Sequence, residues 1–220
     1  NDMKLGLLTP FDTIPYFTTE GFKQVITPEK DESPRVRKLL YRWMKAGHIF
    51  QLKKGVYVTR RFYEAHRNDA LFSAGYSAII LPQSYLSLEY VLQRFGVLTE
   101  ITYPITAITP KNTRIIVNKL GTFTYKHIQS QLYHGFTITE YHGIRLGQAS
   151  LAKALFDYLY LRPLPKTILG VRYNLAEELR LNLDEFSAAN RDEFASYVEG
   201  SGLVKMDHIL KNFRRTVWQP

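Results

Sequence analysis

A run of basic residues in the N-terminal third of the chain is the part of the sequence with the clearest chemistry. Between residues 35 and 61 the sequence contains nine Lys and Arg residues and no acidic residue. They are Arg35, Arg37, Lys38, Arg42, Lys45, Lys53, Lys54, Arg60 and Arg61. Lysine and arginine side chains bind phosphate groups through charge-assisted hydrogen bonds, so the run indicates a polyanionic partner if its side chains share one surface. A solvated charged face without a partner is the alternative interpretation.

Residue types that catalyse reactions or bind metals show no such pattern. The chain has no cysteine, which excludes disulfides, thiolate metal sites and cysteine nucleophiles. His127, His134 and His142 are separated by seven and eight residues, and this spacing matches no common zinc motif. The β-prone region between residues 101 and 144 offers Glu140 as its one acidic residue. We therefore expect no enzymatic activity, no metal site and no cofactor.

The first five of the basic residues fall in a segment with strong helix signals. Ser33 followed by Pro34 is typical of an N-cap and a first-turn proline, and Gly47 is a typical stop, so a helix is predicted over residues 34–46. Apolar residues recur in it with helical spacing. They are Val36, Leu39, Leu40, Trp43 and Met44. This spacing predicts one apolar stripe that packs on a core.

The basic residues of the same helix are predicted on its other side. Because successive residues are rotated by about 100°, Lys38, Arg42 and Lys45 fall nearly opposite the apolar stripe. Arg35 and Tyr41 flank them. The helix is therefore expected to be buried on one face and cationic on the other.

A basic hairpin is predicted directly after this helix. Residues 49–52 and 56–59 are two short β-prone runs, and the sequence Lys53-Lys54-Gly55 between them suits a tight turn in which glycine takes a positive φ. Upstream, Thr18 is expected to cap a short helix that buries its apolar positions. Those positions are Phe22, Val25 and Ile26, and a further short helix is expected over residues 3–8.

This order of helices and hairpin predicts a winged helix-turn-helix, whose last helix fits the major groove of DNA while the hairpin reaches backbone phosphates. The candidate DNA-binding residues are Ser33, Arg35, Arg37, Lys38, Tyr41, Arg42, Lys45, Lys53 and Lys54. Ser33 and the N-terminus of the helix are expected to hold a phosphate. The acidic loop over residues 27–32 must then point away from DNA.

The remainder of the chain predicts a mixed α+β domain. Residues 62–96 look helical, and the β-prone runs between residues 101 and 144 predict a small antiparallel sheet. C-terminal helices are expected over residues 151–161, 175–183, 192–199 and 207–217. The predicted fold class is thus α+β, with a winged helix-turn-helix domain at residues 1–66 and an α+β antitoxin or regulatory domain at residues 67–220.

Composition agrees with a folded protein that meets a polyanion. The chain has 220 residues, 45% of them hydrophobic, and a formal net charge of +9, which favours an anionic partner without identifying it. No apolar run is long enough to span a bilayer, and the first eight residues are too few for a secretory leader. Together with the absence of cysteine, this leads us to expect a cytoplasmic protein without membrane partners.

Several short motifs resemble the AbiEi antitoxins of type IV toxin–antitoxin systems. They are Gly55-Val56-Tyr57-Val58, the run from Pro82 to Glu89, Gly96-Val97-Leu98, the run from Gly121 to Tyr125, and the run from Leu151 to Asp157. The resemblance covers about residues 18–162. The chain departs from the family pattern at Ala152, because the family usually has glutamate at that position of its glutamate-lysine-alanine-leucine motif.

The resemblance implies a transcriptional autorepressor without enzymatic activity of its own. In such a protein the winged helix binds inverted repeats in the promoter of its own operon, and the C-terminal domain counteracts a partner toxin with a nucleotidyltransferase fold. The partner would be functional and need not form a stable complex. Related regulators carry the same N-terminal domain without a demonstrated toxin, so a stand-alone winged-helix transcriptional regulator is the alternative.

Overall fold

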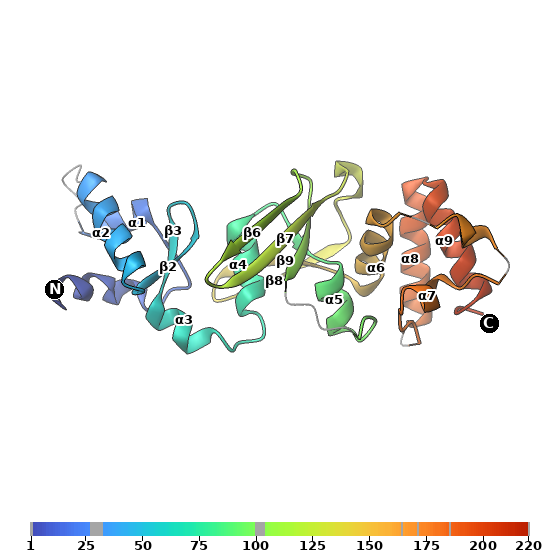
Figure 1. The fold of residues 1–220 in the computed structure, drawn as a ribbon, viewed down its shortest axis with the longest axis horizontal. Helices are drawn as coiled ribbons and strands as arrows, with labels where there is room; N and C mark the ends of the chain where they lie inside the picture. The colour runs from blue at the N-terminus through green and yellow to red at the C-terminus, as the bar shows by residue number, and fades with distance from the viewer. Residues whose placement is uncertain are drawn as a thin grey trace. The chain divides into compact units, whose positions relative to one another are not determined.

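The computed structural model describes residues 2–26, 33–99, 104–163, 165–170, 172–184 and 186–219 (Figure 1). The expectation for the acidic loop at 27–32 therefore lies outside the described residues. The fold is mixed α+β and divides into two compact units. The first contains Asn1–Pro82, Ile116–Thr122 and Glu140–Arg145, and the second contains Gln83–Ile115, Phe123–Thr139 and Leu146–Pro220. The sequence-based boundary between residues 66 and 67 stays a prediction.

The N-terminal 82 residues combine helices with a small antiparallel sheet. The elements are η1 (Asp2–Phe11), β1 (Phe17–Thr18), α1 (Thr19–Ile26), α2 (Ser33–Lys45), β2 (Ile49–Lys53), β3 (Val56–Thr59), α3 (Arg60–His66) and α4 (Phe72–Ile80). The three strands form an antiparallel sheet in the order β1-β3-β2. The helix predicted at 34–46 and the hairpin predicted at 49–59 are both confirmed.

Local signals set these elements as expected. The Thr18 hydroxyl accepts a hydrogen bond from the Gly21 amide at 2.9 Å, which caps the start of α1. Gly55 has φ +76°, a conformation that glycine adopts without steric penalty, and it closes the β2–β3 turn. Thr59 ends β3 and caps α3 by accepting from the Phe62 amide.

Aromatic side chains form the centre of this unit. The ring of Phe22 lies 5.4 Å from that of Phe11, 5.9 Å from that of Phe17 and 5.5 Å from that of Trp43, so four elements meet on one residue. The sequence-based expectation for Val25 was wrong, because its side chain is 56% exposed. Helix α1 has eight residues and buries a narrow stripe around Phe22, which leaves Val25 outside it.

A six-stranded sheet follows, in the order β6-β7-β5-β4-β9-β8. Its strands are β4 (Tyr85–Leu86), β5 (Ile105–Thr109), β6 (Arg114–Asn118), β7 (Gly121–His127), β8 (Phe136–Tyr141) and β9 (Ile144–Ala149). The expectation of an antiparallel sheet was wrong in part, because β4 pairs with β9 and β5 pairs with β7 in parallel. The segment at 62–96, which was expected to look helical, contains α3, α4 and α5 (Glu89–Arg94), and the expectation missed strand β4.

One short helix lies between β7 and β8, and the other helices follow the last strand in the C-terminal part of the chain. They are η2 (Ser130–Leu132), α6 (Leu151–Leu161), η3 (Lys166–Leu169), α7 (Leu175–Glu178), α8 (Ala188–Ser201) and α9 (Val204–Arg215). Helix α6 has the predicted bounds, and the Ser150 hydroxyl caps it. Helix α7 is shorter than predicted, since Arg180 takes φ 52° two residues after its end. Within the described residues, no helix has the length and apolar character needed to cross a membrane.

Candidate nucleic-acid interface

Helix α2 is amphipathic in the way its sequence predicts. Val36, Leu40 and Trp43 are each 5% exposed or less and belong to the core of the first unit. Leu39 and Met44 are partly buried and pack against the same core. The five apolar positions of the predicted stripe therefore all face inward, and this burial fixes which side of α2 is left to solvent.

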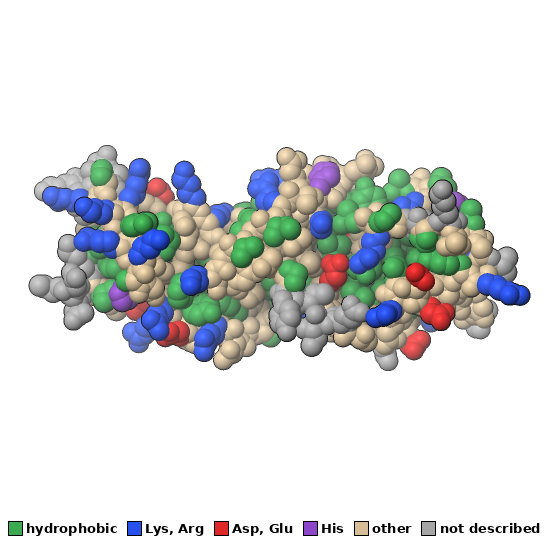
Figure 2. Space-filling model, in the orientation of Figure 1, with side chains coloured by type: hydrophobic (Ala, Val, Ile, Leu, Met, Phe, Trp, Pro, Cys, Tyr) green, Lys and Arg blue, Asp and Glu red, His purple; other side chains and the backbone are tan. Residues whose placement is uncertain are grey.

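The opposite side of α2 is cationic. The exposed residues there are Arg35, Arg37, Lys38, Tyr41, Arg42 and Lys45. Tyr41 is 56% exposed, and the Lys45 ammonium lies 5.6 Å from the centre of its ring. In the described parts of the chain, no carboxylate forms an ion pair with Lys38, Arg42 or Lys45. Figure 2 shows Lys and Arg side chains gathered over the region where Figure 1 draws α2.

The β2–β3 hairpin packs beside α2 and carries two lysines with different environments. Lys54 is exposed in the turn. Lys53 is half-buried, and its ammonium donates a hydrogen bond to the Ile80 carbonyl at 3.5 Å. Of the two lysines predicted to reach phosphate, Lys54 is therefore the one placed for contact with a large partner.

Two basic residues at the end of the run are paired with acids. The Arg60 guanidinium lies 2.6 Å from the Glu64 carboxylate, and that of Arg61 lies 3.7 Å from Asp12. Each of these arginines therefore has a neighbouring carboxylate that partly offsets its charge. We define the basic surface as the exposed side chains of Arg35, Arg37, Lys38, Tyr41, Arg42, Lys45 and Lys54. Ser33 begins α2, and the position of its side chain lies outside the described part of the structure.

The structure adds one cation that sequence reasoning missed. Asn118, in the turn region of the β6–β7 hairpin, donates a hydrogen bond from its amide to the Leu52 carbonyl of β2 at 3.1 Å. The next residue, Lys119, is exposed. It belongs to the first unit together with β2. No local pattern could have found it, because Leu52 and Asn118 are 66 residues apart in the sequence.

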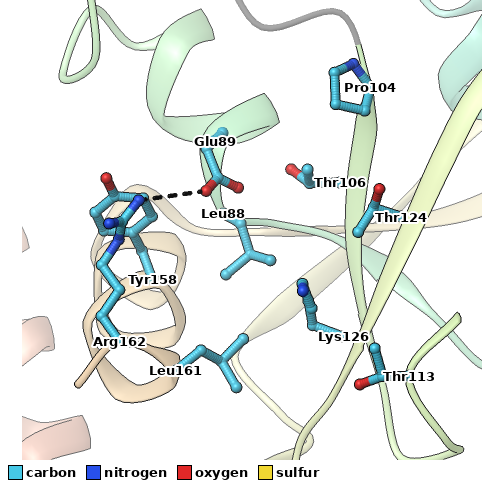
Figure 3. Close-up of a pocket in the computed structure, with 10 residues that line it drawn as sticks. All are labelled: Leu88, Glu89, Pro104, Thr106, Thr113, Thr124, Lys126, Tyr158, Leu161 and Arg162. Atoms are coloured by element: carbon cyan, nitrogen blue, oxygen red, sulfur yellow. Dashed lines mark ion pairs between the residues drawn. The ribbon is translucent and has the colours of Figure 1, made fainter. Parts of the chain in front are cut away.

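The second unit contains a cavity of about 560 Å³ (Figure 3). Helices α5 and α6 line one side, and residues of β5 and β7 line the other. The Glu89 carboxylate lies 3.8 Å from the Arg162 guanidinium, which in turn lies 4.1 Å from the centre of the Tyr158 ring. Because Glu89 and Arg162 form an ion pair, Lys126 is the charged residue outside that pair among the described lining residues.

The comparisons with known proteins do not indicate a function for this chain. No protein-family model matches this chain, and no curated protein matches it. The candidate functional features are therefore the basic surface, the neighbouring hairpin and the order of the elements that form them.

Proposed function

We propose that this protein binds double-stranded DNA through an N-terminal winged helix-turn-helix and acts as a transcriptional repressor. The observation that carries the proposal is helix α2. It buries Trp43 and its neighbours on one side and presents Lys38, Arg42 and Lys45 on the other. The order of helices, with a three-stranded antiparallel sheet arranged β1-β3-β2, supports the same class of domain.

The dimensions of α2 suit this role. An α-helix with its side chains is about 10–12 Å across, and the major groove of DNA is about 12 Å wide. Arginine can bind guanine with two hydrogen bonds, whereas lysine acts mainly as a point charge on phosphates. Arg35 and Arg42 are therefore proposed as base-reading residues. Lys54 in the hairpin turn is proposed as a phosphate contact, and Lys119 can extend the phosphate-binding surface.

The wider biological role rests on the resemblance to AbiEi antitoxins. It extends the proposal to autorepression at inverted repeats in the protein's own promoter, and to counteraction of a nucleotidyltransferase-like toxin by the C-terminal region. No catalytic role is proposed. Two-metal nucleases hold their ions with clustered carboxylates. In the described strands of this chain, Glu140 is the one acidic residue, so such a cluster is not formed there.

DNA binding is tested by fluorescence anisotropy with a labelled duplex from the region upstream of the protein's own coding sequence. We expect the variant Lys38→Ala/Arg42→Ala/Lys45→Ala to bind at least about 100-fold more weakly, because three exposed cations of the groove-facing side are removed. The matched control is Lys111→Ala/Arg172→Ala/Arg214→Ala, which removes three exposed cations of the second unit and the same net charge. Equal affinities of the two variants would contradict the proposal.

The antitoxin role is tested separately by co-expression with a nucleotidyltransferase-like protein encoded next to this chain. If the two roles reside in different units, the triple α2 variant loses repression and still restores growth. If that variant still represses the promoter but no longer restores growth, the toxin-related role lies on α2 and this division is contradicted. If no such neighbouring gene exists, the stand-alone regulator is the better description.

A further inference from the structure

Three side chains that are distant in the sequence meet in the first unit, away from α2. They are His66, the last residue of α3, Asp69 in the following turn, and His142 in the turn between β8 and β9. His66 Nδ1 lies 3.0 Å from Asp69 Oδ2, and His142 Nε2 lies 3.9 Å from the same oxygen. One nitrogen from each histidine and one carboxylate oxygen lie within 4.8 Å of one another.

Two hydrogen-bonded or tight turns fix the backbone that carries these side chains. After α3 the Asp69 amide donates to the His66 carbonyl at 2.9 Å, and the Phe72 amide donates to the Asp69 carbonyl at 3.0 Å, so the turn is hydrogen-bonded at both ends. In the hairpin, His142 and Gly143 have φ 47° and 78°. Two successive residues with positive φ are typical of the tight two-residue turn that joins antiparallel strands. The turn therefore holds the His142 imidazole at the tip of the hairpin.

Two of the distances between the ligand atoms are close to the edge of a tetrahedral metal site. Zinc binds imidazole nitrogen and carboxylate oxygen at about 2.0–2.2 Å, which separates neighbouring ligand atoms by about 3.3–3.6 Å. The observed separations of 3.0 and 3.9 Å lie on either side of that value. The 3.0 Å contact is a hydrogen bond between His66 and Asp69, which an ion bound between them would replace, and all three ligand atoms lie within 4.8 Å of one another.

Neighbouring groups orient the three ligands and leave a path for an ion. The Tyr141 hydroxyl donates to Asp69 Oδ2 at 2.8 Å, which holds the carboxylate in place. The Phe62 ring packs 4.2 Å from that of His66 and 5.4 Å from that of His142. The side chains of His66, Asp69 and His142 are 29%, 39% and 39% exposed. Water can therefore reach the site and fill a fourth position.

We propose that His66, Asp69 and His142 bind one divalent transition-metal ion of the zinc class. Two imidazole nitrogens and one carboxylate suit zinc, cobalt or nickel, whereas calcium and magnesium prefer oxygen ligands alone. The ion links the end of α3 to the β8–β9 turn within the first unit. The proposal is independent of DNA binding, because none of the three ligands belongs to the basic surface.

The test uses the full chain after treatment with a chelator, titrated with Co²⁺ alone and with Zn²⁺ alone. We expect one Co²⁺ per chain with the visible absorption bands of a tetrahedral site, displacement of Co²⁺ by Zn²⁺, and an unfolding midpoint that rises with Zn²⁺ concentration. His142→Asn is the key variant, because asparagine tolerates positive φ and keeps the turn. It should bind both ions at least about tenfold more weakly.

Two further variants complete the test. His127→Asn changes an exposed histidine at the end of β7 and should bind Co²⁺ like the wild type. Tyr141→Phe keeps all three ligands and should weaken binding by about tenfold through loss of the orienting hydrogen bond. Absence of saturable one-to-one binding in the wild type, or equal affinity in the wild type and His142→Asn, would overturn the proposal.

Discussion

Among the described residues, Lys153 and Asp157 are the charged side chains that are completely buried. Both are fully buried one turn apart on α6, with the ammonium 2.8 Å from the carboxylate. The ammonium also donates to the Leu132 carbonyl at 2.8 Å, while Tyr85 and Ser87 donate to the carboxylate at 2.9 and 2.8 Å. Burial raises the pKa of Asp157, and Lys153 opposes that rise. The pair thus connects α6 to two segments far away in the sequence.

Removal of one partner should destabilise the protein strongly. We expect Lys153→Met to reduce the free energy of unfolding by about 3–5 kcal/mol, because it leaves a buried carboxylate without its cation. The measurement is urea unfolding followed by circular dichroism. The matched control is Lys211→Met, which breaks an exposed Lys–Asp pair with Asp207 on α9, also four residues apart, and should change stability by less than about 1 kcal/mol. Similar losses in both variants would show that burial of the α6 pair has no energetic consequence.

Tyr197 on α8 provides a test of pH dependence. Its hydroxyl donates to Glu193 at 2.8 Å, and burial together with this hydrogen bond raises its pKa to about 12. Because an unfolded tyrosine ionises near pH 10, the stabilisation that Tyr197 contributes is complete below that pH and is lost as pH rises from 10 towards 12. Tyr197→Phe should therefore be less stable than the wild type at pH 8, and the difference should shrink between pH 10 and 11.

The measurement is the urea midpoint of both proteins across this pH range. Tyr41→Phe is the control, because Tyr41 is 56% exposed on α2 and its replacement should leave the midpoint nearly unchanged at every pH. A wild-type advantage over Tyr197→Phe that stays constant up to pH 11 would argue against the raised pKa.

At the level of elements, the turn of the β2–β3 hairpin requires a positive φ at one residue, Gly55. Gly55 has φ +76°, and an alanine there should reduce the free energy of unfolding by about 1–2 kcal/mol because its Cβ meets its own backbone in this conformation. Gly200 in α8 has an ordinary helical backbone and no atom within 4 Å of an added Cβ. Gly200→Ala should therefore stabilise the protein by about 0.5–1 kcal/mol. Thermal unfolding of both variants measures this; a stabilising Gly55→Ala would contradict the proposed constraint.

The elements that sequence reasoning placed well are those set by neighbouring residues. Helix α2 has Pro34 in its first turn and ends before Gly47, and the hydroxyl of Ser150 caps the start of α6. The β2–β3 turn is likewise decided by Gly55. In each case a residue next to the element determines where it begins or ends, so the printed sequence contains the required information.

The elements that were missed depend on distant partners. Strand β4 has two residues, and it exists because Tyr85 pairs with Ile108 on one side and with Gly147 on the other. The parallel pairing of β5 with β7 has the same character, since Ile105 lies opposite Phe123. Such pairings are chosen by the packing of the whole sheet, and β propensity alone does not distinguish parallel from antiparallel neighbours.

Over the whole molecule, the candidate DNA-binding residues with described side chains fall within the first unit. The shared surface of those on α2 follows from the helical period and was predictable. Lys119 reaches the same unit through the β6–β7 hairpin, and the cluster of His66, Asp69 and His142 forms through the β8–β9 turn. Neither could be predicted, because no local spacing relates residues that long-range strand pairing brings together.

With a net charge of +9, the proposed DNA binding could depend on the total charge of the protein or on the localised basic surface of α2. The salt dependence of the affinity distinguishes these two cases. If α2 binds phosphates directly, the logarithm of the association constant falls with the logarithm of salt concentration by about 0.9 for each contact. Lys38→Ala/Arg42→Ala/Lys45→Ala should then make this slope less steep by up to about 2.7, depending on how many of the three side chains contact phosphate rather than bases. The control variant Lys111→Ala/Arg172→Ala/Arg214→Ala should keep the wild-type slope, although its net charge equals that of the α2 variant. Anisotropy titrations between about 50 and 200 mM salt measure both slopes. If the two variants shift the slope equally, the total charge of the protein governs binding, and the localised surface on α2 has no special role.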